Sequence, residues 1–319
     1  MSTKQKIIID TDPGVDDAMA IFLALQSPEL EVLGLTTVFG NVEAPLATAN
    51  ALRLLEVAGR PDIPVAHGAE NPVAVPYKGA VPFIHGDDGQ GNVHLPPAQG
   101  KPLDISAAQF IVEQVMRQPG EITLVPIGPL TNVALALRLE PRIAHHAKVV
   151  LMGGNALCPG NASPAAEANI YNDPEAADVV LGAGWDITMV GLDVTHKVCM
   201  TDADLAQIAR METAMARFTT AIVKFYRDFM FDRSGMGGIY VHDSTAVAYL
   251  LEPDAFEVQH WPVRVDTGYG LGRGKTWPDL GKADRPHLPP WQNRPNVRVC
   301  VGVKGERVVA MSLERMAAS

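Results

Sequence analysis

Four aspartates lie within eight residues near the start of the chain, and this cluster is the feature most able to do chemistry. Residues 10–17 read DTDPGVDD. Carboxylates packed this closely repel one another, so either some of them stay protonated or a cation lies among them. Several hard oxygen ligands around a loop favour Ca²⁺ over the smaller Mg²⁺. A helix N-cap would explain Asp16 or Asp17, but not Asp10 and Asp12 at the end of an apolar run.

Two other aspartate motifs fit this segment poorly. An EF-hand loop needs oxygen ligands at alternate positions, a central Gly and a Glu at its twelfth position, and Pro13 and the spacing beyond it do not match. A D-x-D phosphatase would use Asp10 as its nucleophile, but it would leave Asp16 and Asp17 unexplained. It also needs groups that bind phosphate, and no obvious Lys or Arg accompanies these loops.

A His-Asp pair at 242–243 could add to such a site. Asp243 could bind a metal, and His242 could donate a proton, because histidine titrates nearest neutrality. At a loop or a helix start both side chains can reach one cleft. By itself the pair is also typical of a solvated surface or a helix cap.

A third candidate is the Asn- and Glu-rich segment at 159–175. Asn161, Glu167 and Asn169 supply the mixed donors and acceptors that vicinal hydroxyls require. The simpler reading is a polar loop, and residues 172–175 have the Asn-Asp-Pro pattern of a helix start.

Apolar strands that alternate with helical patterns are expected to carry these residues. The predicted strands are 6–10, 31–38, 121–127, 147–151 and 186–192, and the predicted helices are 16–26, 43–58, about 130–139 and about 174–182. Continuous apolar strands linked by helices indicate an α/β fold with a mostly parallel central sheet and helices on both faces. Ligands collect at the carboxyl ends of such strands, and the acidic and Gly/Asn-rich segments follow those ends.

The remaining segments complete the prediction. Residues 68–101 form a long Gly- and Pro-rich stretch, which is typical of a functional or a disordered loop. Short β-like stretches at 263–267 and 297–303 predict small C-terminal β additions. No linker forces a second domain, so 1–319 is expected to form a single domain.

Composition excludes several classes of partner. The net charge is −10 and no Lys/Arg run occurs, so nucleic acid and anionic membranes are not expected partners. The three cysteines are far apart, which argues against a disulfide framework or a zinc site and fits a reducing cytoplasm. The apolar run at 7–9 is too short for a signal peptide, and no stretch is long enough for a membrane span.

Taken together, these motifs resemble the inosine–uridine nucleoside hydrolase family over nearly the whole chain. The resemblance rests on DTDPGVDD at 10–17, TTVFGN at 36–41, HGDDG at 85–89, VPIGPLTN at 125–132, MGG at 152–154, GNASPAAEAN at 160–169 and HD at 242–243. It implies hydrolysis of the N-glycosidic bond of purine or pyrimidine ribonucleosides to free base and ribose. It also implies bound Ca²⁺, a calcium-bound water and an oxocarbenium-like transition state.

The resemblance also assigns roles to individual residues. The Ca²⁺ ligands would be Asp12, Asp17, Asp243 and the backbone carbonyl of Ile127, where the family commonly has Thr. Asp12 would also be the catalytic base and His242 the acid for the leaving group. The ribose would lie among Asp16, Asn41, Met152, Asn161, Glu167 and Asn169, and the base near His85 and His242. Ala168 and Ser244 depart from the family pattern, and these departures are expected to loosen the leaving-group pocket.

The hydrolase mechanism implied by the resemblance is physically consistent, and two other functions remain as alternatives. A nest of carboxylates stabilises a cation-like sugar, and a metal lowers the pKa of its water. One rival is a Mg²⁺-dependent phosphohydrolase, and another is a non-catalytic nucleoside- or sugar-binding protein. The sequence leaves the base preference open, since Trp261 and Trp277 are more typical of core or interface anchors than of base stacking. The resemblance implies a homotetramer or a homodimer.

Overall fold

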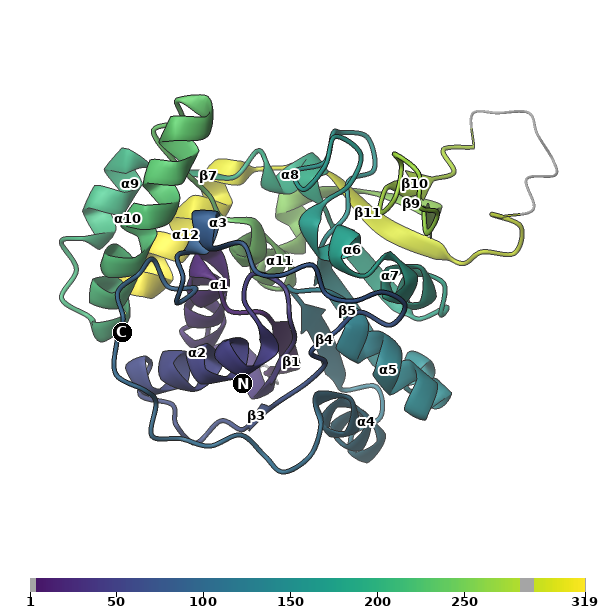
Figure 1. Cartoon of the computed structure of the whole chain (residues 1–319), viewed down its shortest axis with the longest axis horizontal. Helices are drawn as coiled ribbons and strands as arrows, with labels where there is room; N and C mark the ends of the chain where they lie inside the picture. Colours follow the sequence, from purple (N-terminus) through teal and green to yellow (C-terminus); the bar gives the residue numbers. More distant parts are fainter. Residues whose placement is uncertain (1–3, 282–289, 319) are drawn as a thin grey trace.

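The computed structural model describes residues 4–281 and 290–318, and a nine-stranded sheet runs through this part of the chain (Figure 1). From one edge to the other, the strands are β10 (Thr276–Pro278), β9 (Phe256–Val265), β11 (Asn296–Val303), β6 (Asp186–Val190), β5 (Ala147–Met152), β4 (Ile122–Pro126), β1 (Gln5–Thr11), β2 (Leu30–Thr37) and β3 (Val65–Ala66). The strands from β11 to β3 pair in parallel, whereas β9 and β10 are antiparallel. A separate antiparallel pair joins β7 (Cys199–Thr201) to β8 (Gly238–Tyr240).

Helices cover both faces of the sheet. One core contains residues of α1 (Val15–Leu25), α2 (Ala44–Val57), α10 (Ala214–Ser234), α11 (His242–Leu251) and α12 (Gly305–Ala317). The other contains residues of α4 (Ala107–Arg117), α5 (Thr131–Leu139) and α7 (Pro174–Leu181). The shorter helices are α3 (Pro82–His85), α6 (Ala168–Asn172), α8 (Leu192–Thr195) and α9 (Asp202–Ile208), with 3₁₀ turns at Pro141–His145 and Pro253–Ala255.

The central strands are apolar throughout because both of their faces are buried. In β1, Ile7 and Ile9 pack into the core that contains α1, while Ile8 points into the opposite core with α4 and α5. Side chains alternate along a strand, so a strand covered on both sides needs apolar residues at successive positions. Burial of these side chains supplies the hydrophobic stabilisation of the sheet.

These observations confirm the predicted fold. All predicted strands and helices are present, with ends displaced by a few residues at most. The C-terminal stretches at 263–267 and 297–303 fall largely within β9 and β11, so the predicted β additions extend the main sheet. Here β11 pairs with β6 in parallel, as Arg298 opposite Thr188 shows.

The long segment at 68–101 contains one regular element, the short helix α3. Its backbone runs beside α2, where the carboxylate of Glu56 accepts hydrogen bonds from the backbone N–H groups of Gln99 and Gly100. The segment is therefore attached to α2 near its C-terminal end. None of the helices within 4–281 and 290–318 is long and apolar enough to cross a membrane.

Candidate active site

The candidate site lies at the carboxyl ends of the central strands. The turn after β1 carries Asp12, and the first turn of α1 carries Asp16 and Asp17. The segments after β2, β4 and β5 approach these carboxylates through their own backbone and side chains. The N-terminus of α11 adds His242 and Asp243 from the far part of the sequence. Parallel strands place all of their carboxyl ends on one edge, which explains the convergence.

Three carboxylates meet most closely in this site. One oxygen from each of Asp16, Asp17 and Asp243 lies within 4.8 Å of the others, and all three side chains are buried. Asp12 is also buried and close enough to Asp16 and Asp17 for their charges to raise its pKa. We call Asp12, Asp16, Asp17 and Asp243 the carboxylate nest.

Asp17 is held by neighbours on three segments. Thr11 Oγ1 donates to its Oδ1 at 2.5 Å, and its Oδ2 accepts from the backbone N–H of Gly14 at 2.9 Å and from Asn41 Nδ2 at 3.0 Å. The Gly14 contact also forms part of the N-terminal cap of α1. Both oxygens are thus fixed in direction, as a metal ligand requires.

Asp12 has one oxygen fixed and one without a partner. Its Oδ2 accepts a 2.6 Å hydrogen bond from the backbone N–H of Asn41, whereas its Oδ1 is buried without any hydrogen bond. Two glycines make room for this carboxylate. A Cβ on Gly128 would lie 2.6 Å from Oδ1, and a Cβ on Gly40 would collide with Oδ2. A buried oxygen without a partner is costly unless a ligand or a cation completes it.

Burial and mutual repulsion shift the titration of the whole nest. Burial raises the pKa of Asp12, Asp16, Asp17 and Asp243, and the negative charge of Asp17 raises the pKa of Asp12 and Asp16 further. For Asp243, the charges of Asp16, Asp17, Asp12 and Glu167 add to the effect of burial. These groups favour bound protons or a cation among them.

Asp10, the first aspartate of the motif, belongs to a different network. Its Oδ1 accepts hydrogen bonds from Thr36 Oγ1 at 2.6 Å and Asn132 Nδ2 at 2.8 Å, and burial raises its pKa to about 7. Asn132 also donates to the carbonyl of Thr37. The backbone N–H of Ile127 donates to the carbonyl of Asp10. Asp10 therefore ties together the ends of β1, β2 and β4.

Three of the residues expected around ribose, Asn161, Glu167 and Asn169, hydrogen bond to backbone groups that follow or end β4 and β5. Asn169 Nδ2 donates to the carbonyls of Ile127 at 2.8 Å and Met152 at 3.1 Å, so it orients the carbonyl predicted to bind the metal. Glu167 is buried and accepts from the backbone N–H groups of Gly154, Asn169 and Ile170. Asn161 Oδ1 accepts from the backbone N–H of Ala168 at 3.0 Å.

Aromatic rings form the other wall of the site, which we call the ring wall: His85, His196, Tyr226, Tyr240 and His242. The centroids of His85 and Tyr226 lie 5.8 Å apart, and His196, Tyr240 and His242 lie within 4.9–5.5 Å of one another. The charges of Asp16 and Asp243 raise the pKa of the buried Tyr226, which places this ring beside the nest. The sequence indicated only His85 and His242.

Both predicted histidines are uncharged at neutral pH. Burial lowers the pKa of His85 to about 4, and its Nδ1 accepts a hydrogen bond from the backbone N–H of Val15. Burial, helped by the charges of His196 and His85, lowers the pKa of His242 to about 3. The expectation that His242 titrates near neutrality therefore does not hold for this state. Its Nδ1 lies 2.8 Å from Thr195 Oγ1, which fixes the ring.

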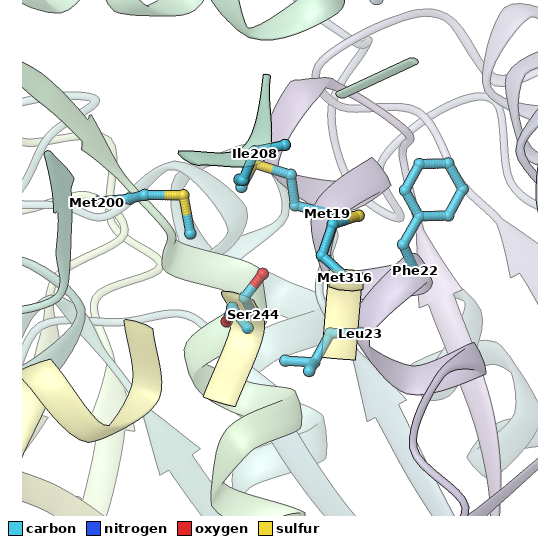
Figure 2. Close-up of a pocket in the computed structure, with 8 residues that line it drawn as sticks. Met19, Phe22, Leu23, Met200, Ile208, Ser244 and Met316 are labelled. Carbon is cyan, nitrogen blue, oxygen red and sulfur yellow. The ribbon is translucent and has the colours of Figure 1, made fainter. Parts of the chain in front are cut away.

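Ser244 lies away from the carboxylates. It lines a small internal cavity with Met19, Phe22, Met200 and other side chains of the core, as Figure 2 shows. The cavity has room for about one water molecule, and Ser244 Oγ is buried without a hydrogen-bond partner. The departure from the family pattern at Ser244 thus affects the packing between α1 and α11, and not the leaving-group pocket.

The donor set fits a hard divalent cation and does not fit a phosphate. The buried carboxylates, the unpaired Asp12 Oδ1 and the Ile127 carbonyl are oxygen donors of the kind that Ca²⁺ prefers. Among the described residues, the hydrogen bonds to Asp10, Asp12 and Asp17 come from hydroxyl, amide and backbone groups, and none comes from Lys or Arg. The phosphohydrolase alternative lacks the cations it needs.

Comparisons with known proteins agree with this geometry. Residues 7–310 match the family described as inosine-uridine preferring nucleoside hydrolase. The chain is 45% identical over 317 residues to a probable uridine nucleosidase 2 of Arabidopsis thaliana, covering 98% of each chain. It is 43% identical over 278 residues to an inosine-uridine preferring nucleoside hydrolase of Leishmania major, covering 86% of this chain and 88% of that protein.

Solved structures extend the similarity to three dimensions. The structure of a plant nucleoside hydrolase, PpNRh1, superposes with a TM-score of 0.97 at 40% identity, covering 99% of this chain and 100% of that one. A purine-preferring ribonucleoside hydrolase from Gardnerella vaginalis superposes with a TM-score of 0.91 at 34% identity, covering 98% of each chain. With its carboxylate nest at the strand ends, this chain belongs to the inosine-uridine preferring nucleoside hydrolase family.

Proposed function

We propose that this ribonucleoside hydrolase cleaves the N-glycosidic bond of uridine and inosine, releasing the free base and ribose. Relatives named for these substrates support the choice. The observation that carries the proposal is the buried carboxylate nest of Asp12, Asp16, Asp17 and Asp243. Such a concentration of negative charge stabilises a sugar that becomes cation-like as its bond to nitrogen breaks.

A Ca²⁺ ion is part of the proposal. Asp12, Asp17, Asp243 and the Ile127 carbonyl would hold it, and Asp16 lies close enough to Asp17 and Asp243 to be a competing ligand. When bound, the ion supplies positive charge that offsets the repulsion in the nest and lowers the pKa of a neighbouring water. The buried Asp12 Oδ1, which has no hydrogen-bond partner in the described chain, supports such a ligand.

Asp12 is proposed as the general base. Its Oδ2 is fixed by the N–H of Asn41, so its unpaired Oδ1 is the atom available to take a proton from the attacking water. Asp16, Asn41, Asn161, Glu167 and Asn169, with Met152 beside the sugar, would hold the ribose. Asn41 donates to Asp17, and Asn161, Glu167 and Asn169 hydrogen bond to backbone groups, so the sugar would meet a preorganised surface.

The ring wall is proposed to receive the base. His242 is uncharged before substrate binds, so it would assist the leaving nitrogen through the N–H of a neutral imidazole, fixed by Thr195. His85 would contact the base from α3. Because its pKa is low, His242 would donate a hydrogen bond to the leaving base and would not be protonated before the reaction.

The remaining expectations belong to the same proposal. We infer that the chain acts as one domain, since one sheet contains strands from Gln5 to Val303. We also infer a homotetramer or homodimer that works in the cytoplasm in nucleoside salvage. The three cysteines, Cys158, Cys199 and Cys300, are unpaired, which supports a reducing compartment.

The direct test is an assay for free ribose from inosine and uridine. The protein should release ribose from both, lose this activity after treatment with a chelator, and regain it with Ca²⁺. Nucleoside binding without ribose release would favour the non-catalytic alternative. Activity that survives complete metal removal would overturn the role of the nest as a cation site.

A further inference from the structure

The C-terminal strand pair β9–β10 contacts the loop that is proposed to bind ribose. This loop runs over residues 153–167, between β5 and α6, and carries Asn161 and Glu167. β10 begins at Thr276 on the edge of the sheet, far along the chain. The contact therefore joins the last part of the sheet to the substrate side of the site.

Thr276 and Lys275 hold the first residues of the loop. The buried Thr276 Oγ1 accepts from the backbone N–H of Asn155 at 2.8 Å and lies 2.9 Å from its carbonyl, to which it donates. Lys275 Nζ donates to the same carbonyl at 2.6 Å and to the carbonyl of Cys158 at 3.2 Å. The two neighbouring side chains thus fix the start of the loop through its backbone.

Asp193 of α8 holds the next two residues. Its Oδ2 accepts from the backbone N–H of Ala156 and its Oδ1 from that of Leu157, both at 2.7 Å. Two N–H groups on one carboxylate form a strong, directional pair. The loop start is therefore held at its carbonyls by Lys275 and at its N–H groups by Asp193.

Asn155 carries this constraint to the end of the loop. Its buried Nδ2 donates to the carbonyls of Cys158 and Ala165, both at 2.9 Å, and so closes the loop on itself. Ala165 is two residues from Glu167. Glu167 in turn accepts from the N–H of Gly154, directly before Asn155.

The tip of the β9–β10 connection is itself anchored. Arg273 makes a bidentate ion pair with Glu175 of α7, at 2.9 Å for each bond, and also donates to the carbonyl of Thr267. Asp266 closes the connection through backbone hydrogen bonds to Lys275 and Gly274. Because the β9–β10 connection is anchored by Arg273 and by Asp266, it can hold the loop at 153–167 in one position.

We propose that Lys275, Thr276 and Asp193 are positioning residues that set the ribose-binding loop and thereby determine discrimination for the ribose hydroxyls. The inference rests on the proposed function, because it assigns the loop to the sugar. None of the three residues contacts the carboxylate nest through a hydrogen bond within the described chain. Their effect should therefore appear in sugar recognition and not in metal binding.

The test compares matched substitutions in the calcium-loaded protein. Thr276→Val removes the hydroxyl at nearly constant shape, and Thr276→Ser keeps it. Lys275→Met removes the ammonium group, and Lys6→Met is its control, since Lys6 also makes two side-chain hydrogen bonds but on β1, to Gln118 and Glu121. All four variants are measured for kcat and KM on inosine and 2′-deoxyinosine, and for Ca²⁺ affinity.

We expect Thr276→Val and Lys275→Met to raise the KM for inosine by about tenfold, the effect of about one lost hydrogen bond. The preference for inosine over 2′-deoxyinosine should shrink by a similar factor, and Ca²⁺ affinity should stay unchanged. Thr276→Ser and Lys6→Met should behave like the wild type. An unchanged preference in both loop variants would overturn the proposal, whatever their thermal stability.

Hydrogen exchange of the Ala156 and Leu157 amides separates this inference from the proposed function. Asp193→Asn places an amide against these N–H groups, so their exchange should accelerate, as should exchange across the loop in Lys275→Met. Unchanged exchange in both variants would contradict the positioning role. A wild-type protein that releases no ribose would instead refute the proposed function, with the exchange result standing independently.

Discussion

The carboxylate nest and the ring wall are neighbouring parts of the site that are held in different ways. Asp12 and Asp17 of the nest are fixed by hydrogen bonds from backbone N–H groups and from Thr11 and Asn41. The ring wall is joined mainly by ring contacts, with His242 tied to Thr195. Directional hydrogen bonds tolerate little variation, whereas packed rings adapt to different flat ligands. If the nest binds the sugar and the ring wall binds the base, as proposed, we expect strict recognition of the sugar and more tolerant selection of the base.

The largest effect is expected from substitutions in the carboxylate nest. Asp12→Asn should lower kcat for inosine by about 10⁴-fold, the upper end for loss of a general base, and should weaken Ca²⁺ binding. The isosteric control Asp16→Asn should cost less in kcat and leave Ca²⁺ affinity within a few-fold of the wild type. Steady-state kinetics and calorimetry measure both. If Asp16→Asn is the variant that loses Ca²⁺, then Asp16 is the ligand beside Asp17 and Asp243.

The next effect tests the ring wall. His242→Ala should lower kcat for inosine and uridine by about 10²–10³-fold, but should affect a nitrophenyl riboside much less, because a nitrophenolate leaves without a hydrogen bond from His242. Thr195→Val, which frees the His242 ring, should show the same pattern more weakly. Equal losses on nucleosides and on the nitrophenyl riboside would show that His242 supports the sugar or the nest instead.

A smaller effect is expected when the sugar or the base of the substrate is changed, which compares the two regions directly. Inosine should be cleaved about 10–100-fold faster than 2′-deoxyinosine, because a missing hydroxyl strands buried polar partners at about 1–3 kcal/mol. Inosine and uridine should differ by less than that. Values of kcat/KM for the three nucleosides show whether the loss of a ribose hydroxyl costs more than a change of base. Deoxynucleosides cleaved as fast as ribonucleosides would demote Asp16 and Asn169 to structural roles.

The smallest effect concerns the stability of the chelated protein. The pKa of Asp10 is raised to about 7, and the pKa values of Asp12, Asp16 and Asp243 are also raised. The pKa of Asp16 is raised to about 8. The folded state thus binds more protons than the unfolded state between about pH 4 and pH 8, so stability falls as the pH rises through this range. We expect Tm to drop on the order of 5 °C from pH 5 to pH 8. Added Ca²⁺ should abolish the drop, and a chelated protein whose Tm rises over this range would refute the assignment.

The strands and the nest could be predicted because their signals are local. The strands are buried on both faces and therefore show continuous apolar runs, and three members of the nest lie within one motif at 10–17. The sequence could not show that Asp10 leaves this group, since its partner Asn132 is 122 residues away. Only the sheet brings β1 and the start of α5 together.

The ring wall could not be predicted because its members come from unconnected elements. His196, Tyr226 and Tyr240 belong to the segments around α8, α10 and β8, and each is an ordinary aromatic residue in its local sequence. The contacts of Thr276 and Asp193 were missed for the same reason, since their bonds reach loop residues 36 or more positions away. The nearest usable signal was the β-like character of the C-terminal region.

The position of β11 has a consequence for the order in which the protein can form during synthesis. β9 is made before β11, yet β11 lies between β6 and β9 in the sheet. Until residues 296–303 leave the ribosome, the hydrogen-bonding groups along this edge of β6 have no partner strand, and β9 and β10 lack the strand that joins them to the sheet. An open parallel edge of this kind invites pairing with another nascent chain. Translation must therefore reach β11 before β9 and β10 can become part of the nine-stranded sheet.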